Sequence, residues 1–187
     1  MRRSRTRFIL AVVAVLALGA VVPAASPAAG PKTETIRLQD ACNLASFNAN
    51  PLTAGGCVQD AGGVSADEFL ARVNPKDFGH RAWWFNAPGG RNGVTTLHAG
   101  DTLRAVNEGG EVHSFTEVPE FGGGCIPQFT VPLGLPLRDF ATDCLPKFGT
   151  IVFPGASRDE TGLAVGTHFF QCVFHPWMRQ TVVVKAA

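Results

Sequence analysis

The amino-acid sequence predicts an all-β fold, a sandwich or a barrel, for the larger part of the chain. From residue 81 onward, short segments rich in β-branched and aromatic residues follow one another, separated by turns rich in Gly, Pro and Asn. The composition is that of a globular protein, with 45% hydrophobic and 17% charged residues among 187. The expected strands are 82–85, 94–98, 102–107, 112–117, 150–153, 167–172 and 180–185.

The first 29 residues are predicted to be a secretory signal peptide. Four arginines lie within the first seven residues, an uncharged apolar run follows at 8–22, and small residues continue to Ala29. The run is shorter than the roughly 20 residues that cross a bilayer, although a retained anchor is the alternative. No second long apolar run occurs, so we expect an exported protein, periplasmic or extracellular, without a transmembrane segment after cleavage.

The net charge changes when this leader is set aside. The whole chain carries +1, but the 16 basic residues less the four leader arginines leave 12 against 15 acidic ones. The mature chain is therefore mildly acidic, which argues against a nucleic-acid partner.

Residues 30–80 are predicted to be an N-terminal extension, and residues 81–187 the β domain. The extension is rich in Gly, Asn and Pro and contains one helix signal. Ser65 is a candidate N-cap with Glu68 as its reciprocal partner, and Asn74-Pro75 ends the helix. We expect this helix to pack against the sheet.

Five cysteines cannot all pair within one chain. In an exported protein most of them are expected to form disulfides. Their positions favour Cys42 with Cys57 and Cys125 with Cys144, which leaves Cys172 free. A buried inert thiol and an intermolecular disulfide are the alternatives for that residue.

Cys172, His175 and Met178 follow one another at short spacing near the C-terminus. Thiolate, imidazole and thioether together are ligands typical of copper, whereas zinc rarely takes a thioether. Met178 is the only methionine after the leader. A second imidazole is needed, and His113, after a Gly turn at the start of an expected strand, is the best candidate.

Three segments, 100–107, 112–115 and 166–178, resemble the cupredoxins, the plastocyanin-like blue copper proteins. The resemblance covers about residues 83–184 and implies a Greek-key β-sandwich. It also implies that His113, Cys172, His175 and Met178 bind one copper ion. The Cys-x-x-His step agrees with plastocyanin-type members, whereas the His-x-x-Met step is two residues shorter than the corresponding step in plastocyanin.

The resemblance implies an exported, monomeric, mononuclear type 1 (blue) copper protein. Its ion would cycle between Cu(I) and Cu(II) and carry single electrons between redox protein partners, without enzymatic activity. Hydrolase, nucleotide-binding and zinc-protease motifs do not occur in the sequence. A copper carrier and a metal-free cupredoxin-like binding module are the alternatives.

The remaining histidines and the acidic residues near His113 receive other predictions. His98 and His80 are expected at the surface. His168 is expected either in the core or in contact with a ligand without binding the metal itself. Trp177 either shields the site or forms a docking patch. Four glutamates are expected to form a solvated face, with the steering of a cationic partner as the alternative, and 121–149 is an insertion without an assigned role. These glutamates are Glu108, Glu111, Glu117 and Glu120.

Overall fold

The computed structural model describes residues 30–58, 62–72, 82–88, 90–91, 93–131 and 134–187. The predicted signal peptide, His80 and the predicted helix end at 74–75 lie outside these residues. Every described helix and strand belongs to one compact unit, Pro31–Ala187.

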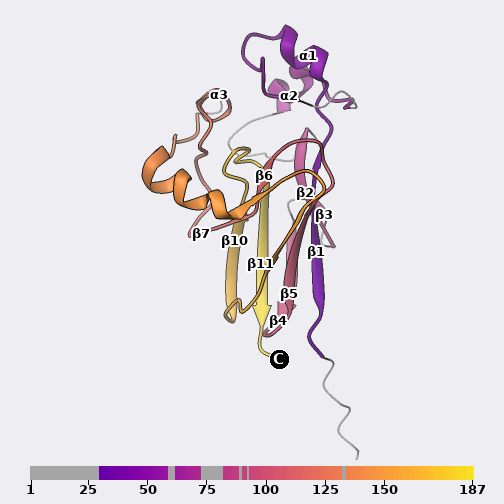
Figure 1. Ribbon diagram of the computed structural model, residues 1–187, viewed down its shortest axis with the longest axis vertical. Helices are drawn as coiled ribbons and strands as arrows, with labels where there is room; N and C mark the ends of the chain where they lie inside the picture. Colours follow the sequence, from indigo (N-terminus) through magenta and orange to yellow (C-terminus); the bar gives the residue numbers. More distant parts are fainter. Residues whose placement is uncertain (1–29, 59–61, 73–81, 89, 92, 132–133) are drawn as a thin grey trace, which may run out of the picture. The chain divides into compact units, whose positions relative to one another are not determined.

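One mixed sheet has the strand order β3-β2-β1-β5-β9 (Figure 1). Strand β1 lies at its centre, antiparallel to β2 and parallel to β5. Alternate residues of β1 and β5 are buried, so one face of this sheet points into the core. The strands are β3 (Gly90–Arg91), β2 (Trp83–Ala87), β1 (Thr33–Asp40), β5 (Thr102–Asn107) and β9 (Ser157–Glu160).

A second sheet has the order β4-β11-β10-β7, and a short pair is formed by β6 and β8. Apolar residues of both sheets, such as Leu38 and Leu103 from the first and Leu97 and Val182 from the second, belong to one buried cluster. The predicted all-β sandwich is confirmed. The strands are β4 (Val94–His98), β11 (Arg179–Lys185), β10 (Gly166–Gln171), β7 (Thr116–Val118), β6 (His113–Ser114) and β8 (Ile151–Val152).

No strand is expected before residue 81, and this expectation is wrong. Strand β1 alternates buried Ile36 and Leu38 with polar neighbours, and it pairs with β5 over six residues of register. The division into residues 30–80 and 81–187 stays a prediction about domains. The sandwich nevertheless takes a central strand from the earlier segment.

The described helices are short. The predicted helix is α2 (Ala66–Arg72), and its N-cap is confirmed because Ser65 Oγ accepts the N–H of Glu68 at 3.1 Å. Phe69 from α2 packs against Trp83 of β2, with ring centroids 5.3 Å apart. The others are α1 (Leu44–Ala49), α3 (Pro127–Thr130), a π-helical turn at Phe140–Cys144 and a 3-10 helix at Leu145–Thr150. None of the described helices is long and apolar enough to cross a membrane.

Two disulfides link Cys42 to Cys57 and Cys125 to Cys144, as predicted. Cys172 is the free cysteine and is buried. The chain-entropy estimate assigns each loop of this size a stabilisation of about 3 kcal/mol.

Candidate metal centre

The loop at 172–178 connects the antiparallel strands β10 and β11. Two backbone hydrogen bonds close it: Cys172 N–H donates to the Met178 carbonyl at 3.1 Å, and Met178 N–H donates to the His175 carbonyl at 2.9 Å. The Cys-x-x-His-x-x-Met spacing is thus the length of a closed hairpin loop, which we name the ligand loop.

His113 reaches the ligand loop from β6. The Asn107 side chain holds the preceding turn, because its amide donates to the carbonyls of Glu111 at 2.7 Å and Val152 at 2.8 Å. Ser114 then ties β6 to the ligand loop, since its N–H donates to Cys172 Sγ at 3.3 Å and its Oγ accepts the Val173 N–H at 2.9 Å. The two segments are therefore fixed to each other by protein hydrogen bonds alone.

Three predicted ligands converge in the structure. The Nδ1 atoms of His113 and His175 are 3.2 Å apart, and Cys172 Sγ lies 4.0 Å and 3.8 Å from them. All three residues are buried. Their side chains come from two segments separated by 59 residues.

These distances fit one metal ion. Bonds of about 2.1 Å from a metal to two nitrogens, meeting at about 100°, place the nitrogens about 3.2 Å apart. A bond of about 2.3 Å to sulfur, at about 125° to each nitrogen, gives a sulfur–nitrogen distance of about 3.9 Å. Two imidazoles and one thiolate are a donor set that suits copper.

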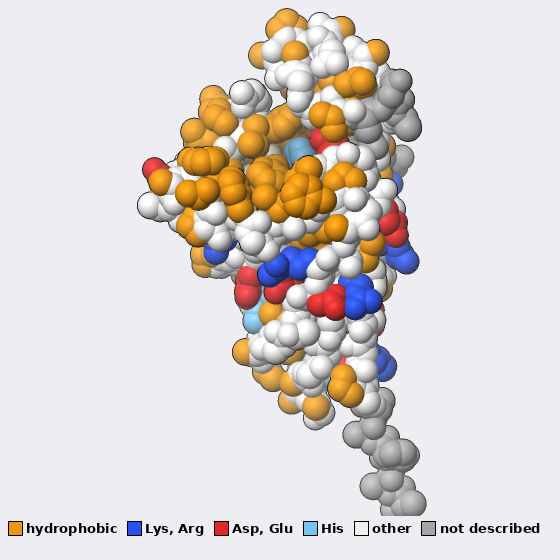
Figure 2. All heavy atoms as spheres, in the orientation of Figure 1, with side chains coloured by type: hydrophobic (Ala, Val, Ile, Leu, Met, Phe, Trp, Pro, Cys, Tyr) orange, Lys and Arg blue, Asp and Glu red, His pale blue; other side chains and the backbone are white. Residues whose placement is uncertain are grey.

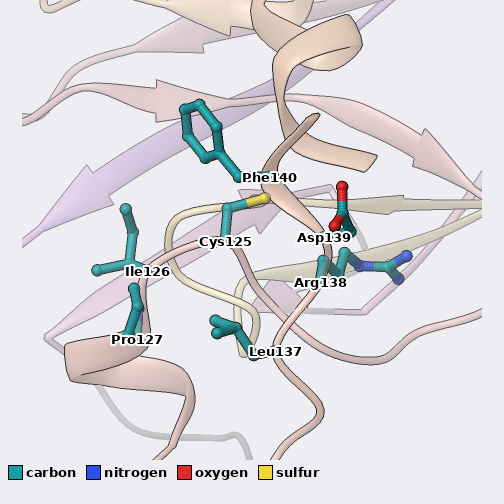
Figure 3. Close-up of a pocket in the computed structure, with 7 residues that line it drawn as sticks. All are labelled: Cys125, Ile126, Pro127, Leu137, Arg138, Asp139 and Phe140. Carbon is teal, nitrogen blue, oxygen red and sulfur yellow. The ribbon is translucent and has the colours of Figure 1, made fainter. Parts of the chain in front are cut away.

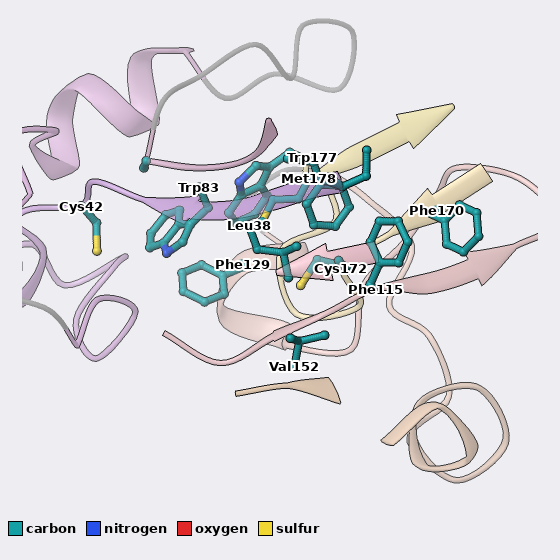
Figure 4. Close-up of a cluster of buried hydrophobic side chains, with 14 of the residues drawn as sticks. Leu38, Cys42, Trp83, Phe115, Phe129, Val152, Phe170, Cys172, Trp177 and Met178 are labelled. Carbon is teal, nitrogen blue, oxygen red and sulfur yellow. The ribbon is translucent and has the colours of Figure 1, made fainter. Parts of the chain in front are cut away.

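Met178, the fourth predicted ligand, is buried in the same core, and Figure 4 shows it beside Trp177. Its backbone closes the ligand loop through Cys172 and His175. Copper ligation by the thioether stays a prediction.

Electrostatics among these three side chains favour a thiolate at Cys172. Burial acts to lower the pKa of His113, but hydrogen bonds to Asp40 and Cys172 outweigh it and raise that pKa to about 9. Burial acts to raise the pKa of Cys172, but the hydrogen bond with His113 and the Ser114 N–H lower it below the usual thiol value. The thiolate is the form that binds a metal.

No family model matches the chain, and no curated protein is significantly similar to it. Solved structures do match. The purple cupredoxin from Nitrosopumilus maritimus matches with a TM-score of 0.38 and 14% identity, over 81% of this chain and 98% of that one. A point variant of amicyanin in its reduced state matches with a TM-score of 0.32 and 24% identity, over 49% of this chain and 69% of that one. Both of these solved structures are cupredoxins.

Sequence reasoning missed Asp40, the last residue of β1. Its side chain is fully buried, and its Oδ1 accepts a hydrogen bond from His113 Nε2 at 3.2 Å. Asp40 lies 73 residues from His113, so only the pairing of β1 within the sheet brings the two together. No local pattern in the sequence signals this contact.

An aromatic cage surrounds His175. The Trp83 ring stacks on the imidazole with centroids 4.9 Å apart and planes 9° apart. Phe129 and Trp177 both lie 5.4 Å from it. Trp177 is fully buried, which agrees with the shielding role predicted for it and not with a docking patch.

Glu111 was expected on a solvated face, and for this residue the expectation is wrong. Its backbone N–H donates to Asp40 Oδ2 at 2.8 Å, and its side chain is buried. There Oε1 accepts the Val58 N–H at 3.0 Å and lies 3.1 Å from the disulfide sulfur of Cys42. The other oxygen, Oε2, is 3.9 Å from His175 Nε2. Burial raises the pKa of Glu111 to about 7.

The segment 121–149 is attached to the back of the ligand loop. Cys125 N–H donates to the Val173 carbonyl at 2.7 Å. The Gln171 side-chain amide accepts the Gly122 N–H at 3.0 Å and donates to the Gly123 carbonyl at 3.0 Å. Phe129 from α3 is one of the aromatic rings that surround His175. This segment therefore braces the ligand loop and closes one side of the centre.

The same segment forms an open pocket of about 630 Å³, drawn in Figure 3. Its lining includes none of the predicted ligands, and Arg138 in its wall donates to the Gly123 carbonyl at 2.8 Å. The lining residues are Cys125, Ile126, Pro127, Leu137, Arg138, Asp139 and Phe140.

Neither of the other described histidines joins the centre. His98 ends β4 with a mostly exposed side chain, as predicted. His168 on β10 contacts Glu117 Oε1 at 2.6 Å and the Ala164 carbonyl at 2.8 Å, so it pairs with a surface carboxylate and is no ligand of the centre.

Charged residues are absent from the two segments that wall the His175 side. Residues 41–58 and 121–137 contain no Asp, Glu, Lys or Arg. Figure 2 shows apolar side chains gathered on the upper part of this face and most charges lower down. Leu52, Val58 and Val131 are among the exposed apolar residues of these segments.

Proposed function

We propose that this protein is an exported mononuclear type 1 (blue) copper protein that carries single electrons between redox partners. The observation that carries the proposal is the convergence of His113 Nδ1, His175 Nδ1 and Cys172 Sγ at distances that suit one metal ion. Two imidazoles, one thiolate and a nearby methionine form the donor set that copper prefers over zinc.

When bound, copper supplies one-electron chemistry between Cu(I) and Cu(II). The chain itself supplies rigidity, because hydrogen bonds of Ser114, Asn107 and the closed ligand loop position the ligands. The aromatic cage and the buried core keep water away from the ligands. A pre-arranged, dry site suits electron transfer, since little rearrangement accompanies the change of oxidation state.

The burial of the three predicted ligands also favours this function over the two alternatives. A copper carrier exchanges its ion through accessible ligands, whereas Cys172 and His113 are fully buried and His175 is 3% exposed. A metal-free binding module has no need for a buried thiol facing two imidazoles. We further propose that the protein acts as a monomer without enzymatic activity and that its redox partners contact the uncharged surface near His175.

Copper titration tests the proposal. Cu(II) added to the purified, metal-free protein is expected to produce an intense blue charge-transfer band at one equivalent. Cys172→Ser is expected to abolish the band, because the charge transfer needs the thiolate sulfur, while the control variant His168→Gln keeps it. Weak, colourless binding in the wild type favours the carrier, and an absence of binding contradicts both copper functions.

A further inference from the structure

Asp40 is a carboxylate placed against a metal ligand from outside the ligand segments. Its side chain is fully buried, and Oδ1 lies 3.2 Å from Nε2 of His113, the ring nitrogen opposite the one that faces Cys172. A carboxylate can only accept, so His113 donates its Nε2–H to it. This hydrogen bond leaves the Nδ1 lone pair of His113 for the metal.

The surrounding backbone is built around this carboxylate. Asp40 Oδ2 accepts the Glu111 N–H at 2.8 Å, so both oxygens have a partner in the turn that leads to His113. Gly109 lies so close that an added Cβ would be 1.4 Å from Asp40 Oδ1. The turn therefore approaches the carboxylate as closely as its backbone permits.

We propose that Asp40 is a positioning residue of the copper centre, which orients His113 and whose negative charge favours Cu(II) over Cu(I). This inference rests on the proposed copper-binding function. A hydrogen-bonded carboxylate makes an imidazole ligand more basic, and losing such a partner commonly costs roughly 10–100-fold in metal affinity. A more basic ligand and a nearby negative charge stabilise the more highly charged ion.

The chain contains a matched control. Asp101 is also a buried aspartate whose two oxygens accept backbone N–H groups, from Lys32 and His98, both at 2.8 Å. It sits at the turn between β4 and β5, and none of the three ligands contacts it. Asparagine has an NH₂ group in place of one carboxylate oxygen, so in either variant an NH₂ group faces an N–H group that the carboxylate used to accept. The two variants thus share this structural defect, but only Asp40 contacts a predicted ligand.

The experiment compares the wild type, Asp40→Asn and Asp101→Asn, each loaded with copper. Affinities for Cu(II) and Cu(I) are measured by chelator competition, and the reduction potential by redox titration. Asp40→Asn is expected to lose about 10–100-fold in Cu(II) affinity and much less in Cu(I) affinity. Each tenfold fall in the ratio of Cu(II) affinity to Cu(I) affinity raises the reduction potential by about 59 mV. Asp101→Asn is expected to leave the potential unchanged.

A wild-type measurement covers the case in which Asp40→Asn does not fold. In the diamagnetic Cu(I) protein, ¹⁵N NMR is expected to show His113 with its proton on Nε2 and with slow exchange of that proton. A proton on Nδ1, or rapid exchange, overturns the role of Asp40. Equal potentials in the wild type and Asp40→Asn also overturn it while the copper function stands. A wild type that binds no copper overturns both.

Discussion

The two histidines of the centre are held in opposite ways. His113 is fixed by polar contacts: a buried carboxylate at 3.2 Å and a turn tied down by the Asn107 amide. His175 is fixed by rings, with Trp83 stacked on it at 4.9 Å and Phe129 and Trp177 at its sides.

This difference separates two tasks. A hydrogen bond selects which ring nitrogen carries the proton, and its charge acts on the metal. Ring packing holds the plane of an imidazole and contributes mainly through the apolar surface that it buries. Damage on the His175 side should therefore reduce stability first, and damage on the His113 side should change the electronic properties of the centre.

The largest effect is expected from Trp83→Ala. Trp83 is fully buried, and it contacts Phe47, Phe69 and Trp177 as well as His175. Truncation of such a side chain costs about 3–5 kcal/mol of the free energy of unfolding. Urea denaturation of the metal-free protein measures it, and Trp83→Phe, which keeps a ring in the cage, should lose less.

Trp84→Ala is the control for Trp83→Ala. Trp84 is the next residue of β2 and is also buried, but its ring lies under the Arg91 guanidinium at 4.3 Å. It should lose stability without altering the blue band. Trp83→Ala should broaden or shift the band because His175 loses its stacking partner. Identical spectra in both variants would show that the cage does not hold His175.

A smaller effect is expected from Gly109→Ala, which acts on the polar side. The added Cβ would overlap the Asp40 carboxylate, so the turn or Asp40 has to shift, at a cost of about 1–3 kcal/mol. The reduction potential should rise, as in Asp40→Asn. Gly63→Ala is the control, because a Cβ at Gly63 meets nothing within 4 Å. If Gly109→Ala lowers stability and leaves the potential unchanged, the turn does not control the metal through Asp40.

Local spacing explains what could be predicted of the centre. Cys172, His175 and Met178 occupy one hairpin loop, so their pattern is visible in seven consecutive residues. His113 could be predicted as the second imidazole because a Gly turn precedes an expected strand there. The disulfides likewise follow from cysteines that are 15 and 19 residues apart.

The supporting residues depend on strand pairing, which the sequence does not display. Strand β1 pairs in parallel with β5, about 70 residues further along, and this pairing carries Asp40 to His113. In the sequence Glu111 resembles the other glutamates near His113, whereas in the structure its carboxylate contacts the Val58 N–H and the Cys42 sulfur in the interior. These placements are tertiary effects that override local polarity.

The pair formed by His168 and Glu117 has the same chemistry as His113 with Asp40 but lies nearer to water. The His168 side chain is 14% exposed and that of Glu117 is 52% exposed, whereas His113 and Asp40 are both at 0%. The hydrogen bond to Glu117 is the main cause that raises the pKa of His168 above its ordinary value of 6.5. Because solvent screens this pair, its contribution to stability should stay below about 1 kcal/mol.

The smallest predicted effect is therefore a pH dependence. A group whose pKa is raised on folding stabilises the folded protein in its protonated form. The contribution of His168 is fully present below pH 6.5, its ordinary value, and is lost as the pH rises through the raised folded-state pKa. The measurement is the difference in the free energy of unfolding between the wild type and His168→Gln across this range, in which the titration of His113 cancels. A difference that stays constant or grows with pH would show that Glu117 does not stabilise the imidazolium.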